Sequence, residues 1–171
     1  WKNHAFEWLP RVTAEQRAEF VRAGRERVAD FDFTEINQKG AIVPVGDREE
    51  YFPIYYVQPY AGNEVVLGFD VASETKRRNV LEQARDDGRV VASEGIVFLQ
   101  GGDELALFMA LAVYKNEPTS LEERNSQLEG FVVILINLGA LVQEAATLTN
   151  YRDINFSLID ATGSQNRVLF N

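Results

Sequence analysis

Short runs of β-branched and aromatic residues, separated by turn residues, constrain the fold of this chain most strongly. The clearest runs lie at residues 42–45, 51–58, 64–69 and 105–114. Such runs, punctuated by Gly, Asp and Asn, predict strands joined by tight turns. Predicted helices lie among them without the regular strand–helix alternation of a parallel sheet. The sequence therefore predicts an α+β fold with antiparallel sheet.

Helix-start signals separate these runs. Thr13-Ala14-Glu15-Gln16 and Ser120-Leu121-Glu122-Glu123 have the form of capping boxes, in which two side chains satisfy the first backbone N–H groups of a helix. Ser73 is a candidate N-cap for a further helix, which Gly88 would end. A short helix is also expected near the N-terminus, through Phe6, Trp8 and Leu9. We therefore expect N-terminal helices before the sheet.

The C-terminal part repeats the theme on a smaller scale. We expect a strand at 131–136, a helix at 138–148 and two strands at 154–160 and 167–170. No linker rich in Pro, Gly or Ser divides the chain, whose 171 residues match one domain, or two very small ones sharing a core. Two small sheets with flanking helices are expected.

Composition excludes several classes of protein. The chain has no cysteine, which removes thiol catalysis, cysteine-based zinc sites and disulfides. Its formal net charge of −9, with scattered cations, argues against nucleic acid or anionic lipid as a partner. The longest apolar runs are too short to span a membrane. Because the chain opens on Trp1 and has no signal peptide, we expect a piece of a longer protein.

No catalytic, metal or cofactor site is expected. His4 is the only histidine, so a triad or a histidine-based metal site would depend on it alone. Gly101-Gly102-Asp103-Glu104-Leu105 resembles the signature of diguanylate cyclases, but the other nucleotide- and metal-binding stretches of that family have no counterpart. A polar turn between two apolar strands explains the string better.

Asp70 is the acid of most interest. It ends the predicted strand at 64–69, where the chain turns toward the helix beginning at Ser73. A carboxylate there could accept hydrogen bonds from a small molecule held over the sheet, or it could cap the helix. Position alone leaves both readings open.

Several stretches, in this order and spacing, resemble the CHASE domain. They are Glu50-Tyr51-Phe52-Pro53-Ile54-Tyr55-Tyr56, Gly68-Phe69-Asp70-Val71-Ala72-Ser73 and Ala112-Val113-Tyr114-Lys115. The resemblance extends over nearly the whole chain. It implies an extracytoplasmic sensor module between two transmembrane helices, with a stalk helix and two PAS-like antiparallel sheets. The stalk region would be about 1–40, the membrane-distal subdomain 41–130 and the membrane-proximal subdomain 131–171.

The resemblance also implies a ligand pocket in the distal subdomain. Asp70 matches the aspartate that binds the adenine ring in plant cytokinin receptors, and Ala92 matches a backbone contact. We expect the rest of the pocket to include Tyr55, Phe69, Ser93, Phe108 and Ala110. The family often has Thr-Pro where this chain has Ser93-Glu94, and Pro where it has Ala112. Recognition of adenine therefore does not carry over.

The expected function is periplasmic sensing of a small organic molecule without a cofactor, relayed to a cytoplasmic histidine kinase or cyclic-di-GMP effector. The partners expected are a second copy, through the stalk helices, and a membrane reached only through flanking helices. Three alternatives stay open. They are another periplasmic sensor that clamps an amino acid or carboxylate with an arginine such as Arg78, a degenerate cyclase built on residues 101–105, and a spacer without ligand.

Overall fold

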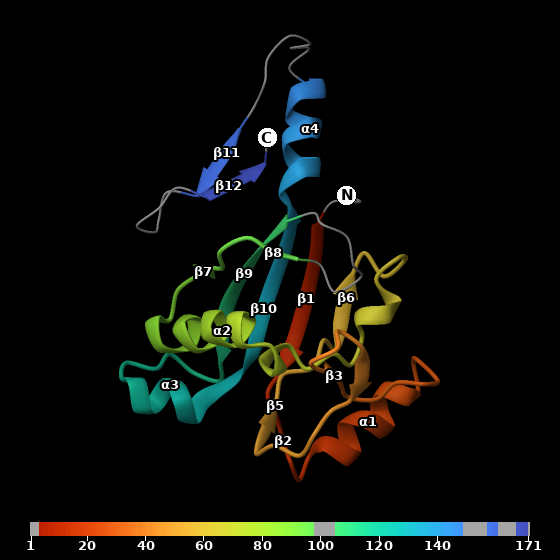
Figure 1. Ribbon diagram of the computed structural model, residues 1–171. Coiled ribbons are helices and arrows are strands. Elements are labelled where there is room, and N and C mark those ends of the chain that lie inside the picture. The colour runs from red at the N-terminus through yellow and green to blue at the C-terminus, as the bar shows by residue number, and fades with distance from the viewer. Residues whose placement is uncertain (1–3, 98–104, 149–156, 161–166, 171) are drawn as a thin grey trace.

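A central antiparallel sheet organises the computed structural model, which describes residues 4–97, 105–148, 157–160 and 167–170 (Figure 1). Its six strands follow the order β6-β1-β10-β9-β7, and β8 pairs with β9 next to β7. The strands are β1 (His4–Pro10), β6 (Tyr56–Gln58), β7 (Val91–Ala92), β8 (Ile96–Val97), β9 (Leu105–Tyr114) and β10 (Leu128–Asn137). The mixture of helices and antiparallel strands confirms the α+β class.

Smaller elements surround this sheet. They are β2 (Val12–Thr13), α1 (Arg17–Arg25), β3 (Thr34–Ile36), β4 (Ile42–Pro44), β5 (Glu50–Tyr51), η1 (Glu64–Val66), η2 (Val71–Ser73), α2 (Thr75–Asp87), α3 (Leu121–Gln127), α4 (Leu138–Leu148), β11 (Leu158–Asp160) and β12 (Arg167–Phe170). β2 pairs with β5, β3 with β4 and β11 with β12. In Figure 1, α2 lies over one face of the sheet, and α4 extends beyond the end where β1 begins.

The first described segment is a strand, so the helix expected through Phe6, Trp8 and Leu9 was wrong. β1 lies between β6 and β10, with Glu7 opposite both Val57 and Val133. Alternate residues of β1 are buried, which is the period of a strand with one face on a core. Pairing on both sides satisfies the backbone groups of the segment. The first helix among the described residues is α1.

The run at 64–69 was expected to be a strand, and this was also wrong. Residues 64–66 form the 3-10 turn η1, and Gly68 follows with φ +83°. Phe69 then makes only an isolated bridge to Thr34, and Asp70 one to Pro53. The β-branched pair Val65-Val66 therefore misled the prediction, because tertiary contacts override strand propensity here.

The strand expected at 131–136 belongs to the central sheet, within β10. The predicted boundary after residue 130 thus lies inside a strand that pairs with both β1 and β9. In the described C-terminal part only β11 and β12 pair beyond this sheet. The stalk region, the two subdomains and their PAS-like character stay predictions. The turn expected at 101–104 lies outside the described residues.

Helix α2 and the sheet enclose the main core. Val80, Leu81 and Ala84 form the buried stripe of α2, and they pack with Phe108 and Phe131 of the sheet. Gly88 ends the helix in the left-handed conformation, as predicted. The N-cap is Glu74 rather than Ser73, and its carboxylate accepts the first backbone N–H groups. The capping box at Ser120 is confirmed at the start of α3.

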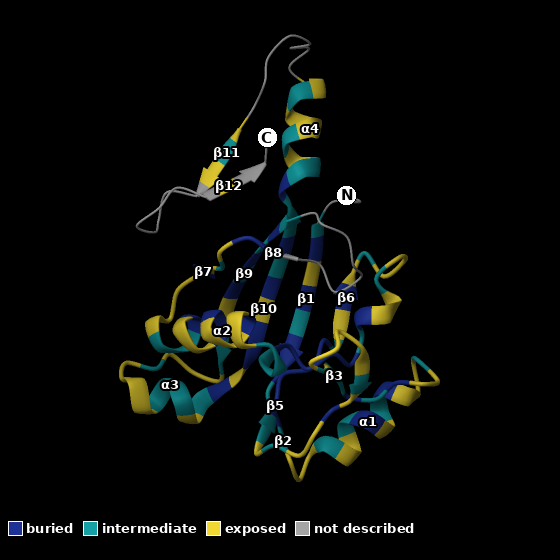
Figure 2. Ribbon diagram, in the orientation of Figure 1, coloured by how far each residue is buried: buried dark blue, intermediate teal, exposed yellow. Residues whose placement is uncertain are grey.

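A second cluster lies beneath α1. Its buried members are Val12, Val21, Phe31, Phe33, Val45 and Tyr51. Figure 2 shows buried residues concentrated along the sheet and the inner side of α2, whereas α4 is exposed over most of its length. Within the described residues, no helix is both long and apolar enough to cross a membrane.

Candidate ligand site

The sheet face beneath α2 carries one continuous row of paired residues. Glu7 of β1 lies opposite Val57 of β6 and Val133 of β10. Val133 lies opposite Ala110 of β9, which lies opposite Val91 of β7. The buried positions of β9 are Ala106, Phe108, Ala110 and Ala112. Three of these four residues are alanines, so most of the side chains that this strand directs toward α2 are small and apolar.

A carboxylate and a guanidinium are buried in this core. Glu7 is 6% exposed and Arg77 of α2 is 5% exposed. Burial raises the pKa of Glu7 to about 8, partly offset by the charge of Arg77. Burial lowers the pKa of Arg77, against the attraction of Glu74 and Glu7. Arg77 Nη1 lies 3.4 Å from Glu74 Oε2. Two ionisable groups thus meet an otherwise apolar face.

Asp70 is completely buried in a separate polar network. One carboxylate oxygen accepts the backbone N–H of Phe52 at 2.9 Å, and the other accepts Arg48 Nη1 at 3.0 Å. Arg48 also bonds the carboxylate of Glu35. Burial raises the pKa of Asp70, while hydrogen bonds from Phe52 and Ala72 and the charge of Arg48 oppose the shift. The carboxylate therefore joins the segments around β3, β5 and η2.

The predicted pocket residues do not all lie together. Phe69, Phe108 and Ala110 are buried in the main core. Ser93 joins them at the sheet edge, because its backbone N–H donates to Phe108 O at 2.7 Å and its Oγ accepts Phe108 N–H at 3.1 Å. Ala92 lies beside Ser93, opposite Met109, and is exposed.

Tyr55 lies in the second cluster. Its ring packs edge-on against Phe20 and Phe31, with Arg27 4.4 Å from its centroid. Its hydroxyl donates to Phe20 O at 3.3 Å. These contacts separate Tyr55 from the other predicted pocket residues. Its contact with a ligand stays a prediction.

Sequence reasoning missed Glu7, Arg77 and Arg48. An acid alternating with Ala5 and Leu9 would have been a usable signal, but only after the segment had been recognised as a strand. Arg77 belongs to a basic run that predicts a solvated helix face. Arg48 lies between strands, and its partners Glu35 and Asp70 are distant in sequence.

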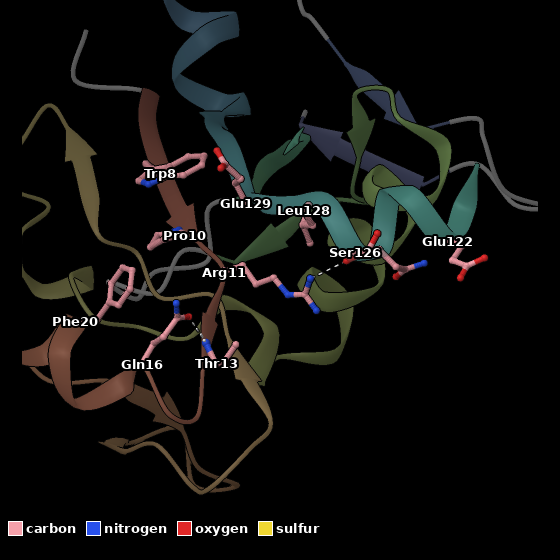
Figure 3. Close-up of a pocket in the computed structure, with 11 residues that line it drawn as sticks. Trp8, Pro10, Arg11, Thr13, Gln16, Phe20, Glu122, Ser126, Leu128 and Glu129 are labelled. Atoms are coloured by element: carbon pink, nitrogen blue, oxygen red, sulfur yellow. Dashed lines mark hydrogen bonds between the residues drawn. The ribbon is translucent and has the colours of Figure 1, made fainter. Parts of the chain in front are cut away.

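Charged residues line a groove and a smaller cavity elsewhere in the molecule. An open groove of about 1070 Å³ lies between α1, β1 and α3, with Trp8 and Phe20 along one side (Figure 3). Arg11 crosses it and donates to Asn125 O at 2.7 Å. A smaller, more enclosed cavity of about 120 Å³ adjoins Arg48 and α2. No group of three or more His, Cys, Asp or Glu side chains in the described ranges could hold a metal ion.

Comparison with known families assigns the chain to a family. The family model of the CHASE domain matches residues 2–170, essentially the whole chain. The chain therefore belongs to the CHASE domain family. No curated protein sequence matches it. CHASE domains are extracellular sensor domains of signalling receptors, so this chain is a signal-transduction module rather than a catalytic domain. The resemblance noted in the sequence is confirmed.

Proposed function

We propose that this chain senses a small organic molecule outside the cytoplasm for a transmembrane receptor, and binds it on the sheet face beneath α2. The burial of Glu7 on the inner face of β1 carries this proposal. Burying ionisable groups among apolar side chains costs free energy unless partners compensate them. A ligand with polar groups would compensate Glu7 while its apolar part covered the alanines of β9.

Asp70 is proposed as a second polar contact. The hydrogen bonds from Phe52, Ala72 and Arg48 occupy three of the about four lone-pair positions of the carboxylate, which leaves one acceptor position for a ligand. The predicted neighbours Phe69, Ser93, Phe108 and Ala110 would complete the apolar and polar lining, and Ala92 would offer its backbone. This assignment rests on the family resemblance and on their common place in or beside the main core.

The route of the signal is proposed to run through β10. This strand contributes Phe131 and Val133 to the core, and α4 follows it without an intervening residue. A ligand that favoured one position of β10 over another would shift α4 accordingly. The receptor would be a dimer through stalk helices in the inner membrane, with a histidine kinase or a cyclic-di-GMP enzyme as its effector.

Thermal unfolding against a panel of adenine derivatives, amino acids, small carboxylates and polyamines tests the proposal. A ligand at about one hundred times its Kd adds about 2.7 kcal/mol, which raises Tm by about 5–10 °C for a domain of this size. We expect Glu7→Gln to lose most of that rise. Glu19→Gln, an exposed substitution on α1, is the matched control and should keep it. A ligand that stabilises both variants equally would contradict the site.

A further inference from the structure

A second site is suggested by the cavity beside Arg48. It lies where η2 and residues 78–85 of α2 meet β10 and the segment around β5. Its inner wall is apolar and consists of Phe52, Leu81 and Phe131, all buried. Its volume of about 120 Å³ is well below that of pockets for drug-sized ligands, about 300–1,000 Å³. The cavity therefore suits only a small apolar group.

Charged side chains surround the mouth of this cavity, and most of them have partners. Arg48 bonds Asp70 and Glu35. Arg85 Nε lies 2.7 Å from Asp86, and Glu50 lies 2.7 Å from Arg11 Nε. These contacts satisfy two of the three arginines and one of the two glutamates that line the cavity.

Arg78 and Glu82 are the remaining pair. Both are exposed on α2, and within the described part of the chain neither side chain has a hydrogen bond or ion pair. Residues four apart lie on the same face of a helix, about 6 Å apart along its axis. The mouth thus presents one cation and one anion, side by side, above an apolar pocket.

We propose that this cavity binds a free α-amino acid with a small branched apolar side chain. Arg78 would bind the α-carboxylate and Glu82 the α-ammonium, and the side chain would contact Phe52, Leu81 and Phe131. The volume of the cavity is about four times the volume that one water molecule occupies in the liquid. A side chain of four carbon atoms fills a similar space, so it fits. The cavity shares Phe131 with the sheet face beneath α2, and Arg48 links it to Asp70, but Glu7 does not line it.

Calorimetric titration with L-leucine tests this inference. We expect binding by the unmodified chain, and binding about tenfold or more weaker in Arg78→Gln and in Glu82→Gln, since each substitution removes a charge-assisted hydrogen bond. Lys76→Gln, also exposed on α2 but outside the cavity, is the control and should bind normally. Amide resonances of Ala72 and Leu81 should shift on titration, which would locate the ligand.

Two fragments of leucine test the zwitterion directly. 4-Methylpentanoate lacks the ammonium group and 3-methylbutylamine lacks the carboxylate, so each should bind at least about tenfold more weakly than leucine. No binding of leucine up to millimolar concentration would overturn the inference. The inference would also be overturned if Arg78→Gln and Glu82→Gln bound leucine as tightly as the unmodified chain, or if either fragment bound as tightly as leucine. Because Glu7→Gln leaves this cavity intact, loss of leucine binding in that variant would assign leucine to the sheet face instead.

Discussion

Glu7 places a titratable carboxyl where folding makes ionisation costly. Its pKa of about 8 lies above the ordinary value of 4.5, because burial disfavours the charged form more than Arg77 restores it. Between these two values the folded chain holds a proton that the unfolded chain has lost. The stability of the fold therefore falls as the pH rises through this range.

We predict that Glu7→Gln flattens this pH dependence. The unmodified chain should lose a few kcal/mol of unfolding free energy between about pH 5 and pH 8, since each unit of pKa shift corresponds to about 1.4 kcal/mol. Glutamine is neutral throughout, so the variant should keep its stability. Urea unfolding at several pH values measures both. Parallel pH profiles of the two chains would contradict the burial of an ionisable Glu7.

Asp70 is proposed to contact the ligand, and its hydrogen bonds also stabilise the fold. We predict that Asp70→Ala is destabilised by about 2–4 kcal/mol, because Phe52 N–H loses its acceptor and Arg48 one of its partners. Asp70→Asn should lose less, since its amide oxygen still accepts from Phe52. Urea unfolding would distinguish the two. A fully stable Asp70→Ala variant would show that the carboxylate has no structural role.

The sequence pointed to Asp70 through family resemblance and chain position, but it could not show how the carboxylate is held. Its partner Arg48 is separated from it by η1 and the segment around β6, so the ion pair depends on tertiary structure. Glu7 was missed for a different reason. An acid in a segment taken for a surface helix needs no explanation, whereas the same acid on the buried face of a strand does.

Gly68 shows how one residue allows two elements to cross. Its φ is +83°, and a Cβ there would lie 2.0 Å from the backbone oxygen of Asp32. The segments around β3 and η1 pass at this point, with Thr34 N–H donating to Gly68 O at 3.0 Å. Gly62 has a similar φ of +88° but nothing within 4 Å of the same position.

We predict that Gly68→Ala destabilises the fold much more than Gly62→Ala does. Gly62→Ala should cost about 1–2 kcal/mol, the ordinary penalty of a left-handed L-residue. Gly68→Ala adds a backbone clash, so it should cost at least twice as much or prevent folding. Thermal unfolding of the two variants gives the comparison. Equal losses in Tm would mean that the backbones around Gly68 and Asp32 do not approach so closely.

Elements with strong local signals were predictable. Helices α2, α3 and α4 and strands β9, β10 and β12 lie where capping residues, left-handed glycine or long apolar runs indicated them. β1 and the segment at 64–69 were not. In β1 the period-two burial depends on strands from distant parts of the chain, and in the second case Gly68 and the bridges to Thr34 and Pro53 end any extended pairing.

The whole molecule combines segments that are distant in sequence. β1 takes an interior position in the sheet by pairing with the edge strand β6 on one side and with β10 on the other. No local pattern specifies this order or the register that places Glu7 beside Val133 and beneath α2. The α+β class followed from the pattern of elements, and the sensor role from the family. The buried charges on the sheet face became visible only with the fold.

A crystal structure of the chain with the panel compound that raises its Tm most would test the central claim directly. We predict that the compound lies between α2 and the sheet, within hydrogen-bond distance of Glu7, with β9 alanines against its apolar part. Binding only in the open groove beside Trp8, or elsewhere on the surface, with an undisturbed core beneath α2, would contradict the account of the sheet face as the sensing site.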